Sequence, residues 1–332
     1  MINLATDPAM TAEATVVKNA GSHFLLSRLP EWRLFPAVLR GKARLGRGTA
    51  TNPVAVGDRV RYSCGPEADE KHPAVITEVL PRRNYLIRRS TNLSRQSHVI
   101  AANLDQVLVT VSLYFPEVKL PFLDRILVTC EVYGIPAVIL LNKIDMYGGE
   151  VPEQVEEFVR IYGQQAGYPV IPTSAVTGEG IDRLRDICRG RLSLFTGESG
   201  VGKSSLIKAV DPSLNPKTGL ISAAHLQGRH TTSLYEMYRL SAGGDDSGAS
   251  AEGGYVIDAP GLRGFGLVDM DKDEIYRYFP EMLRVSDDCR FIPCTHTHEP
   301  GCAVKAAVED GRISPERYNS YLGMREDDKK FR

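Results

Sequence analysis

The residues with the clearest chemical meaning form the stretch "GESGVGKSS" at 197–205. Gly197, Gly202, Lys203 and Ser204 fit a phosphate-binding loop, whose glycines let backbone N–H groups turn toward phosphate oxygens. The lysine neutralises the β and γ phosphates, and the serine hydroxyl ligates magnesium. The stretch follows a predicted strand and opens a predicted helix, as the motif requires. We expect phosphate contacts from Gly197, Glu198, Ser199, Gly200, Val201, Gly202, Lys203, Ser204 and Ser205.

A phosphate loop does not choose a base, but "NKID" at 142–145 can do so. It ends a predicted strand, and open α/β sheets bind ligands at the carboxyl ends of their strands. The Asp145 carboxylate can accept hydrogen bonds from N1–H and the 2-amino group of guanine, a donor pair that adenine lacks. Asn142 can hold the base edge or the loops, and the Lys143 stem can cover the ring beside Ile144. This pattern favours GTP over ATP.

Further segments suit the remaining parts of a GTP site. In "TSA" at 173–175, the Ala175 N–H can approach guanine O6 while Ser174 braces the loop. Asp258 closes the apolar run "YVID" and suits a magnesium contact through water, and the Gly261 N–H suits the γ-phosphate. The polar loop "LQGRHTTSL" adds two hydroxyls that either reach magnesium or serve the turn, those of Thr231 and Thr232.

Three cysteines and two histidines crowd into a short segment near the C-terminus. Cys289, Cys294 and Cys302 would supply three thiolates, with His296 or His298 as the fourth ligand. Soft sulfur and nitrogen ligands in a closed set of four indicate a structural zinc ion. Disulfides would leave one of the three cysteines unpaired, and a catalytic zinc would need an open coordination position.

The elements that position these residues fall into three groups. Residues 1–14 are expected to be disordered. Over 15–92, short apolar runs between turn signals, from "ATVVKNAGSHFLL" to "NYLIRRS", predict roughly five strands of a small OB-fold barrel. Over 93–267, strands alternate with helices, which is typical of a mostly parallel sheet with helices on both faces. Over 268–332, helical runs flank the Cys/His cluster.

Charge is unevenly distributed along this chain of net charge −1. Residues 28–95 hold fourteen Lys and Arg against six Asp and Glu, so this segment alone suits an anionic partner such as RNA, unless it is a solvated basic surface. The candidate RNA contacts are Arg40, Lys42, Arg44, Arg59, Arg61, Arg82 and Arg83. No apolar run is long enough to cross a bilayer and the N-terminus does not resemble a signal peptide, so we expect no membrane contact and a cytoplasmic location.

Taken together, "NKID", "TSA", "GESGVGKS", "GRHTT" and "DAPG" are the five GTPase motifs in the order four, five, one, two, three. With a barrel before them and a Cys/His cluster behind, the chain resembles the RsgA (YjeQ) family of circularly permuted GTPases. The resemblance extends to "NPVAVGDRV" in the barrel and "CAVKAAVEDGRISPERYNSYL" near the end.

The resemblance implies a multidomain chain: an N-terminal OB-fold barrel, a permuted α/β P-loop GTPase domain and a mainly helical zinc domain. It implies GTP hydrolysis stimulated by the 30S ribosomal subunit during late subunit maturation, with 16S rRNA as a partner, and we expect a monomer. It also implies that His230 positions the attacking water and that His296 is the zinc ligand. The chain departs from the family pattern at Ala259, where a threonine is usual, and Leu262 stands where Ras-like proteins carry a glutamine.

Two other interpretations remain open. A guanine-nucleotide-gated RNA-binding scaffold with negligible turnover would carry the same motifs. A P-loop kinase would need a phosphoryl-acceptor pocket and would give "NKID" no role.

Overall fold

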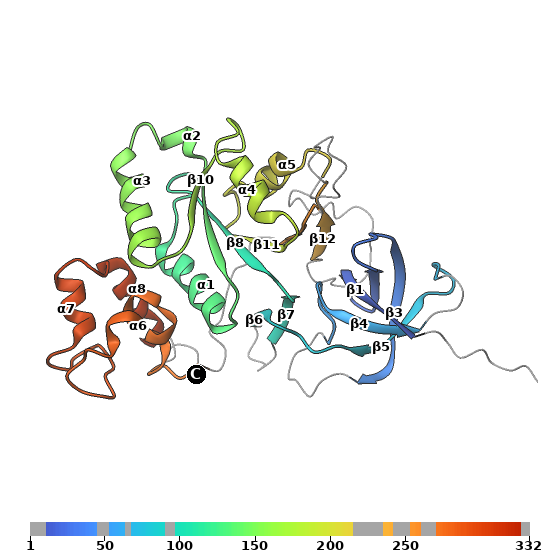
Figure 1. Ribbon diagram of the computed structural model, residues 1–332, viewed down its shortest axis with the longest axis horizontal. Coiled ribbons are helices and arrows are strands. Elements are labelled where there is room, and N and C mark those ends of the chain that lie inside the picture. Colours follow the sequence, from blue (N-terminus) through green and yellow to red (C-terminus); the bar gives the residue numbers. More distant parts are fainter. Residues whose placement is uncertain are drawn as a thin grey trace, which may run out of the picture. The chain divides into compact units, whose positions relative to one another are not determined.

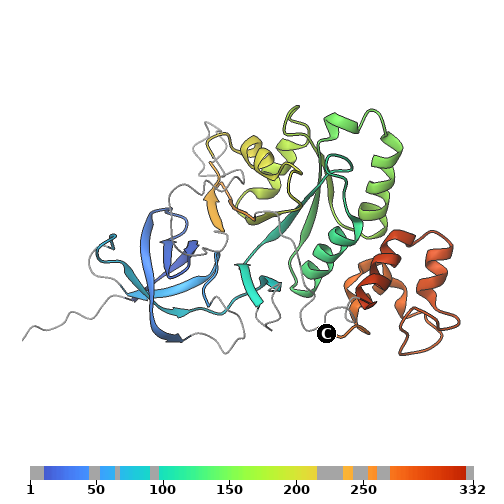
Figure 2. The ribbon, with the colours of Figure 1, turned by 180° about the vertical axis from the view of Figure 1, so that it is seen from behind.

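The computed structural model describes residues 11–44, 53–63, 68–89, 97–214, 235–241, 253–259 and 270–326. The chain divides into two compact units, drawn in Figures 1 and 2. The barrel unit comprises Met1–Asp105, Cys188–Leu194 and Asp211–Pro260, and the sheet unit comprises Gln106–Ile187, Phe195–Val210 and Gly261–Arg332. Among the described helices, none has the length and apolar character needed to span a membrane.

Five strands of the barrel unit close on themselves. They are β1 (Thr11–Ala20), β2 (His23–Ser27), β3 (Leu34–Arg44), β4 (Arg59–Ser63) and β5 (Ala74–Val79). Their order is β1-β2-β3-β5-β4, and β4 pairs back with β1, so these five strands close into a barrel. Only β3 and β5 run parallel among these neighbours. This closed five-stranded barrel confirms the predicted OB-fold.

Alternation along the strands explains how the barrel fills. On β4, Val60 and Tyr62 point inward and are almost fully buried, whereas Arg59 and Arg61, which alternate with them, are not. The apolar core of the barrel consists of Ala14, Val16, Phe24, Leu26, Ala37, Val54, Val60, Tyr62, Ala74 and Ile76.

One predicted barrel strand lies elsewhere. The run "NYLIRRS" forms β6 (Tyr85–Arg89), which pairs antiparallel with β7 (Ser97–Ala102) in a separate two-stranded sheet. The strand is confirmed, but its predicted place in the barrel is wrong, because β propensity identifies a strand without saying which strand it pairs with. The apolar run "YVID" forms β13 (Tyr255–Asp258), which pairs antiparallel with β12 (Glu236–Arg239).

The sheet unit has parallel strands covered by helices. Its strands are β8 (Gln106–Val111), β9 (Ala137–Asn142) and β10 (Val170–Thr173), in the order β10-β9-β8, and β11 (Leu192–Thr196) ends in this unit. β8 and β9 are buried along their whole length, as expected for strands with both faces covered. The helices are α1 (Leu120–Val132), α2 (Ile144–Tyr147), α3 (Pro152–Val159), α4 (Ile181–Cys188) and α5 (Lys203–Val210). The chain continues from α3 as a π-helix over Arg160–Gln165.

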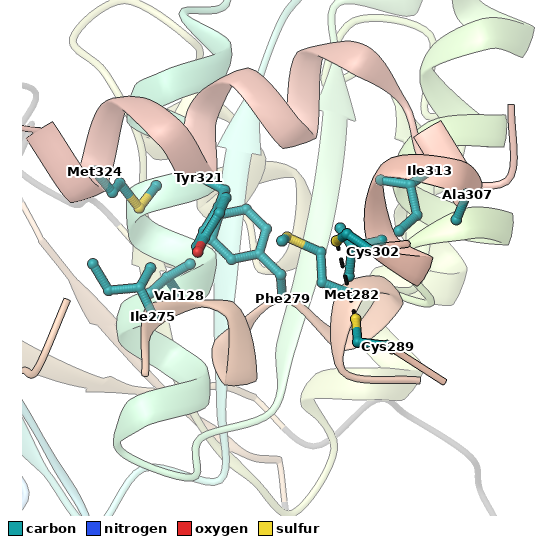
Figure 3. Close-up of a cluster of buried hydrophobic side chains, with 11 residues drawn as sticks. Val128, Ile275, Phe279, Met282, Cys289, Cys302, Ala307, Ile313, Tyr321 and Met324 are labelled. Atoms are coloured by element: carbon teal, nitrogen blue, oxygen red, sulfur yellow. Dashed lines mark hydrogen bonds between the residues drawn. The ribbon is translucent and has the colours of Figure 1, made fainter. Parts of the chain in front are cut away.

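The C-terminal segment packs within the same unit. It contains a 3-10 helix (Ile275–Tyr278), α6 (Pro280–Ser286), α7 (Ala303–Glu309) and α8 (Pro315–Glu326). Figure 3 shows Val128 of α1 beside Phe279, Met282 and Tyr321 in one buried cluster. The C-terminal helices therefore share a core with α1.

Candidate nucleotide and metal sites

The phosphate-binding motif connects β11 to α5, as predicted. Gly197 has φ 144° and Gly202 has φ 97°, values that residues with a side chain rarely adopt. A Cβ on Gly197 would lie 2.1 Å from the Thr110 carbonyl oxygen, and one on Gly202 would lie 2.4 Å from Asn142 Nδ2. Both glycines are therefore needed for the close approach of this loop to β8 and β9.

The lysine of the motif lies inside its own loop. Lys203 is 8% exposed, and its ammonium donates hydrogen bonds to the carbonyl oxygens of Gly197 (2.9 Å) and Glu198 (2.7 Å). The positive charge is thus held at the centre of the loop by the first residues of the motif. Ser204 and Ser205 follow in the first turn of α5.

Asn142 joins the two nucleotide motifs. Its side chain is 2% exposed at the end of β9, and its Nδ2 donates a 2.8 Å hydrogen bond to the Val201 carbonyl in the phosphate loop. Its Oδ1 accepts a 3.2 Å hydrogen bond from Thr173 Oγ1 at the end of β10. One side-chain amide therefore ties together "GESGVGKSS", "NKID" and "TSA", although "NKID" comes first in the sequence.

The other base-reading candidates lie beside this amide. Lys143 has a left-handed backbone with φ 65°, and its ammonium donates to the Phe115 carbonyl oxygen. Asp145 is exposed in the first turn of α2, where its carboxylate is accessible to a ligand. Ser174 Oγ accepts hydrogen bonds from the N–H groups of Val176 (3.1 Å) and Thr177 (3.0 Å) in the loop that carries Ala175.

A tyrosine that the sequence did not reveal as part of the site supports the end of β9. Tyr147 donates a 2.7 Å hydrogen bond to the Asn142 carbonyl oxygen and accepts one of 3.4 Å from the Leu113 N–H. Burial raises the pKa of Tyr147, so its hydroxyl remains a donor. A tyrosine two residues after "NKID" was the available signal, but its role depends on folding back against β9.

Several predicted residues lie outside the described ranges, namely His230, Thr231, Thr232, Gly261 and Leu262. Asp258 is described: it ends β13 opposite Glu236 in the barrel unit and is half-buried. Ala259, the departure from the family pattern, is fully buried.

The Cys/His cluster comes together in the sheet unit. The ligand atoms of Cys289, Cys294, His296 and Cys302 all lie within 4.8 Å of one another. His296 Nδ1 is 3.6 Å from Cys289 Sγ and 3.5 Å from Cys302 Sγ. The rival imidazole, that of His298, is exposed and contacts the Thr297 hydroxyl through its Nδ1 at 2.9 Å. His296 therefore lies beside the cysteine sulfurs, whereas the His298 ring faces the Thr297 hydroxyl.

The donor set fits a cation better than it fits a disulfide. The sulfurs of Cys289 and Cys302, joined by a dashed line in Figure 3, are 4.0 Å apart, about twice a disulfide bond length. Burial raises the pKa of Cys294 to about 12 and also raises that of Cys302, while burial lowers the pKa of His296. Neutral thiols packed this closely stabilise one another only weakly. A bound cation, by contrast, stabilises thiolates and takes a neutral imidazole as a ligand.

Hydrogen bonds fix the loop that carries these ligands. Tyr318 on α8 donates to the His296 carbonyl oxygen at 2.6 Å, and Tyr321 donates to that of Thr295 at 2.6 Å. The Glu299 carboxylate accepts from the Thr295 N–H (2.8 Å) and from the Thr297 N–H (3.1 Å). Burial opposes the charge, but these bonds lower the pKa of Glu299 well below its ordinary range. The ligands are thus positioned by the fold.

The basic residues proposed for RNA are largely ion-paired within the barrel unit. Arg59 and Arg61 contact Glu13 at 2.7 and 3.5 Å. Arg82 bonds the buried Asp58 through two nitrogens, at 2.7 and 2.8 Å, and Arg83 bonds Asp105 at 2.6 Å. The Arg82 pair fixes the fold, whereas Arg59 is well exposed. The side chains of Arg40, Lys42 and Arg44 lie outside the described part of the structure.

Comparisons with known proteins agree with this geometry. The model of the RsgA GTPase family matches residues 79–268. The small ribosomal subunit biogenesis GTPase RsgA of Bacteroides fragilis is 46% identical over 312 residues, covering 94% of this chain and 96% of that protein. The protein of the same name from Porphyromonas gingivalis is 42% identical over 316 residues, with 95% and 97% covered.

Solved structures show the same fold. YjeQ from Thermotoga maritima superposes with a TM-score of 0.73 at 32% identity, over 96% of this chain and 98% of that one. YloQ, described as a circularly permuted GTPase, gives a TM-score of 0.68 at 24% identity, over 97% and 96%.

Proposed function

This chain belongs to the RsgA GTPase family, and from that membership we propose that it hydrolyses GTP to GDP and phosphate during late maturation of the small ribosomal subunit. It is a GTP hydrolase of small-subunit biogenesis. We further propose that the 30S subunit stimulates turnover and that the chain binds 16S rRNA. We also propose that it acts as a monomer in the cytoplasm.

One observation carries the proposal: the hydrogen bond from Asn142 to the Val201 carbonyl. It joins the base-reading motif to the phosphate loop, so Asp145 and Lys203 serve one nucleotide. The exposed Asp145 carboxylate is available to the guanine donors, and the Ala175 N–H to O6. A P-loop kinase would have no use for that arrangement.

When GTP binds, the Lys203 ammonium moves from the loop carbonyl oxygens to the β and γ phosphates. The N–H groups of the loop then bind the phosphate oxygens. Ser204 and Asp258, with Thr231 of the switch loop, are the proposed magnesium ligands, direct or through water. Magnesium, when bound, neutralises charge that develops on the phosphates. His230 is proposed to orient the attacking water, and Gly261 to contact the γ-phosphate through its N–H.

The Cys289, Cys294, His296 and Cys302 set fits one structural zinc ion, because it supplies four soft donors in a preformed arrangement. We propose that this ion fixes the loop between α6 and α7 on the core shared with α1. The barrel unit then supplies the ribosomal contact through basic side chains, and the described candidates with exposed side chains are Arg59, Arg61 and Arg83.

The experiment that tests this function measures phosphate release from GTP with and without purified 30S subunits. We expect slow release from the protein alone, marked stimulation by subunits, and no release from Lys203→Ala. Binding of GTP and of subunits with no stimulated release would instead support the guanine-nucleotide-gated scaffold. A His230→Ala variant should lose stimulated turnover while still binding nucleotide.

A further inference from the structure

A segment without an assigned role lies between the two nucleotide motifs. Residues 112–116, "SLYFP", follow β8 at its carboxyl end. Two contacts fix this segment to the base-reading motif: the Leu113 N–H donates to Tyr147 Oη, and the Lys143 ammonium donates to the Phe115 carbonyl. A Cβ on Gly200 would come within 3.8 Å of Pro116, so the segment also borders the phosphate loop.

Phe115 is held in a backbone conformation that is costly for a bulky residue. Its φ of 56° is left-handed, a region that bulky residues rarely adopt. Its side chain is nonetheless 68% exposed. Lys143, at the other end of the same hydrogen bond, is also left-handed, with φ 65°. Paired backbone strain of this kind concentrates at ligand sites, where it pre-organises a contact.

We propose that the Phe115 ring is an apolar wall for the nucleoside half of the bound nucleotide, a role that rests on the proposed GTP function. The Lys143–Phe115 hydrogen bond places the aromatic residue at the edge where "NKID" meets the phosphate loop. Aromatic rings bind purines and ribose by stacking and apolar contact, which is insensitive to the hydrogen-bonding pattern of the base. Phe115 therefore contributes affinity, and Asp145 contributes the choice of guanine.

The test compares Phe115→Ala with Phe291→Ala. Phe291 is a matched control, because its phenyl ring is also exposed (47%) and it lies between Cys289 and Cys294, on the loop that carries the Cys/His cluster. Calorimetry measures the binding of GDP and of inorganic pyrophosphate, which occupies only the phosphate loop. We expect Phe115→Ala to reduce the affinity for GDP about tenfold, which is in the range of one base-stacking contact, and to leave the affinity for pyrophosphate unchanged. Phe115→Tyr should restore GDP affinity, and Phe291→Ala should change neither ligand.

Two results would overturn the inference. Equal GDP affinity of wild type and Phe115→Ala would mean that the ring does not contact the nucleotide. An equal loss of GDP and pyrophosphate would mean that it only supports the phosphate loop. If the wild-type protein did not bind GDP at all, the proposed function itself would fail, so the two failures are distinguishable. In turnover, Phe115→Ala should raise KM for GTP and preserve kcat, because stacking is made equally in ground and transition states.

Discussion

Arg317 on α8 donates a 2.8 Å hydrogen bond to Asp124 on α1, and both side chains are almost completely buried. The same guanidinium bonds Glu281 on α6 at 2.6 and 3.1 Å, and Tyr162 donates to Asp124 at 2.9 Å. One cation thus joins α1, which flanks the phosphate loop, to two helices of the C-terminal segment that carries the Cys/His cluster. Lys119, just before α1, lies 3.7 Å from Glu198 in the phosphate loop. The C-terminal segment with the Cys/His cluster is therefore an integral part of the sheet unit.

Removing this cation should destabilise the sheet unit strongly. Arg317→Met leaves two carboxylates buried without their partner, so we expect the free energy of unfolding to fall by about 3–5 kcal/mol. Arg312→Met is the control, because Arg312 pairs with Asp310 at 2.9 Å on an exposed surface, and it should cost less than about 1 kcal/mol. Urea unfolding followed by circular dichroism measures both. Equal effects of the two substitutions would show that the buried network adds nothing.

Nucleotide binding should depend on the amide that joins the motifs. Asn142→Ala removes the bond to Val201 and leaves a buried carbonyl unpaired, so we expect GDP affinity to fall about tenfold or more. Asn19→Ala is the matched control, because Asn19 Nδ2 makes a similar bond to the Val54 carbonyl at 2.7 Å in the barrel. Calorimetric titration should show the loss only for Asn142→Ala. A comparable loss in both variants would indicate a general stability effect.

The metal site makes a prediction that separates two neighbouring imidazoles. His296→Ala should abolish binding of one zinc ion per chain, and His298→Ala should retain it, since only His296 points toward the sulfurs. Metal content by mass spectrometry after dialysis checks this. Stripping the ion with a chelator should also lower the melting temperature of the wild type. Retention of zinc by His296→Ala together with its loss in His298→Ala would reverse the assignment.

In the barrel, substitutions of Arg82 and Arg59 should differ in their effects on stability and on subunit binding. Arg82→Met leaves the fully buried Asp58 unpaired and should reduce the free energy of unfolding by about 2–3 kcal/mol. Arg59→Met breaks only an exposed pair with Glu13 and should leave stability within about 1 kcal/mol. If Arg59 contacts an rRNA phosphate, its loss should instead weaken binding to the 30S subunit and make that affinity less dependent on salt concentration. Unchanged subunit affinity of Arg59→Met would remove Arg59 from the interface.

The features that could be predicted from sequence are those encoded over a few adjacent residues. "GESGVGKSS", "NKID" and the Cys289–Cys302 segment each carry their own chemistry, and the order of the first two indicated the permuted fold. Arg317 and Asp124 are far apart in sequence, and no local pattern marks their pairing. The partner of β6, the hydrogen bonds of Tyr147 and the exposure of Phe115 likewise depend on tertiary packing, which short-range periodicity does not encode.

The central claim is that "NKID", although it precedes the phosphate loop, reads the base of the nucleotide bound there. Asp145→Asn replaces an acceptor with an amide that can donate to the 2-oxo group of xanthine. Competition calorimetry with GDP and xanthosine diphosphate tests this directly. We expect wild type to prefer GDP, and Asp145→Asn to lose GDP affinity while gaining affinity for xanthosine diphosphate. An unchanged preference for GDP in Asp145→Asn would contradict base reading by "NKID".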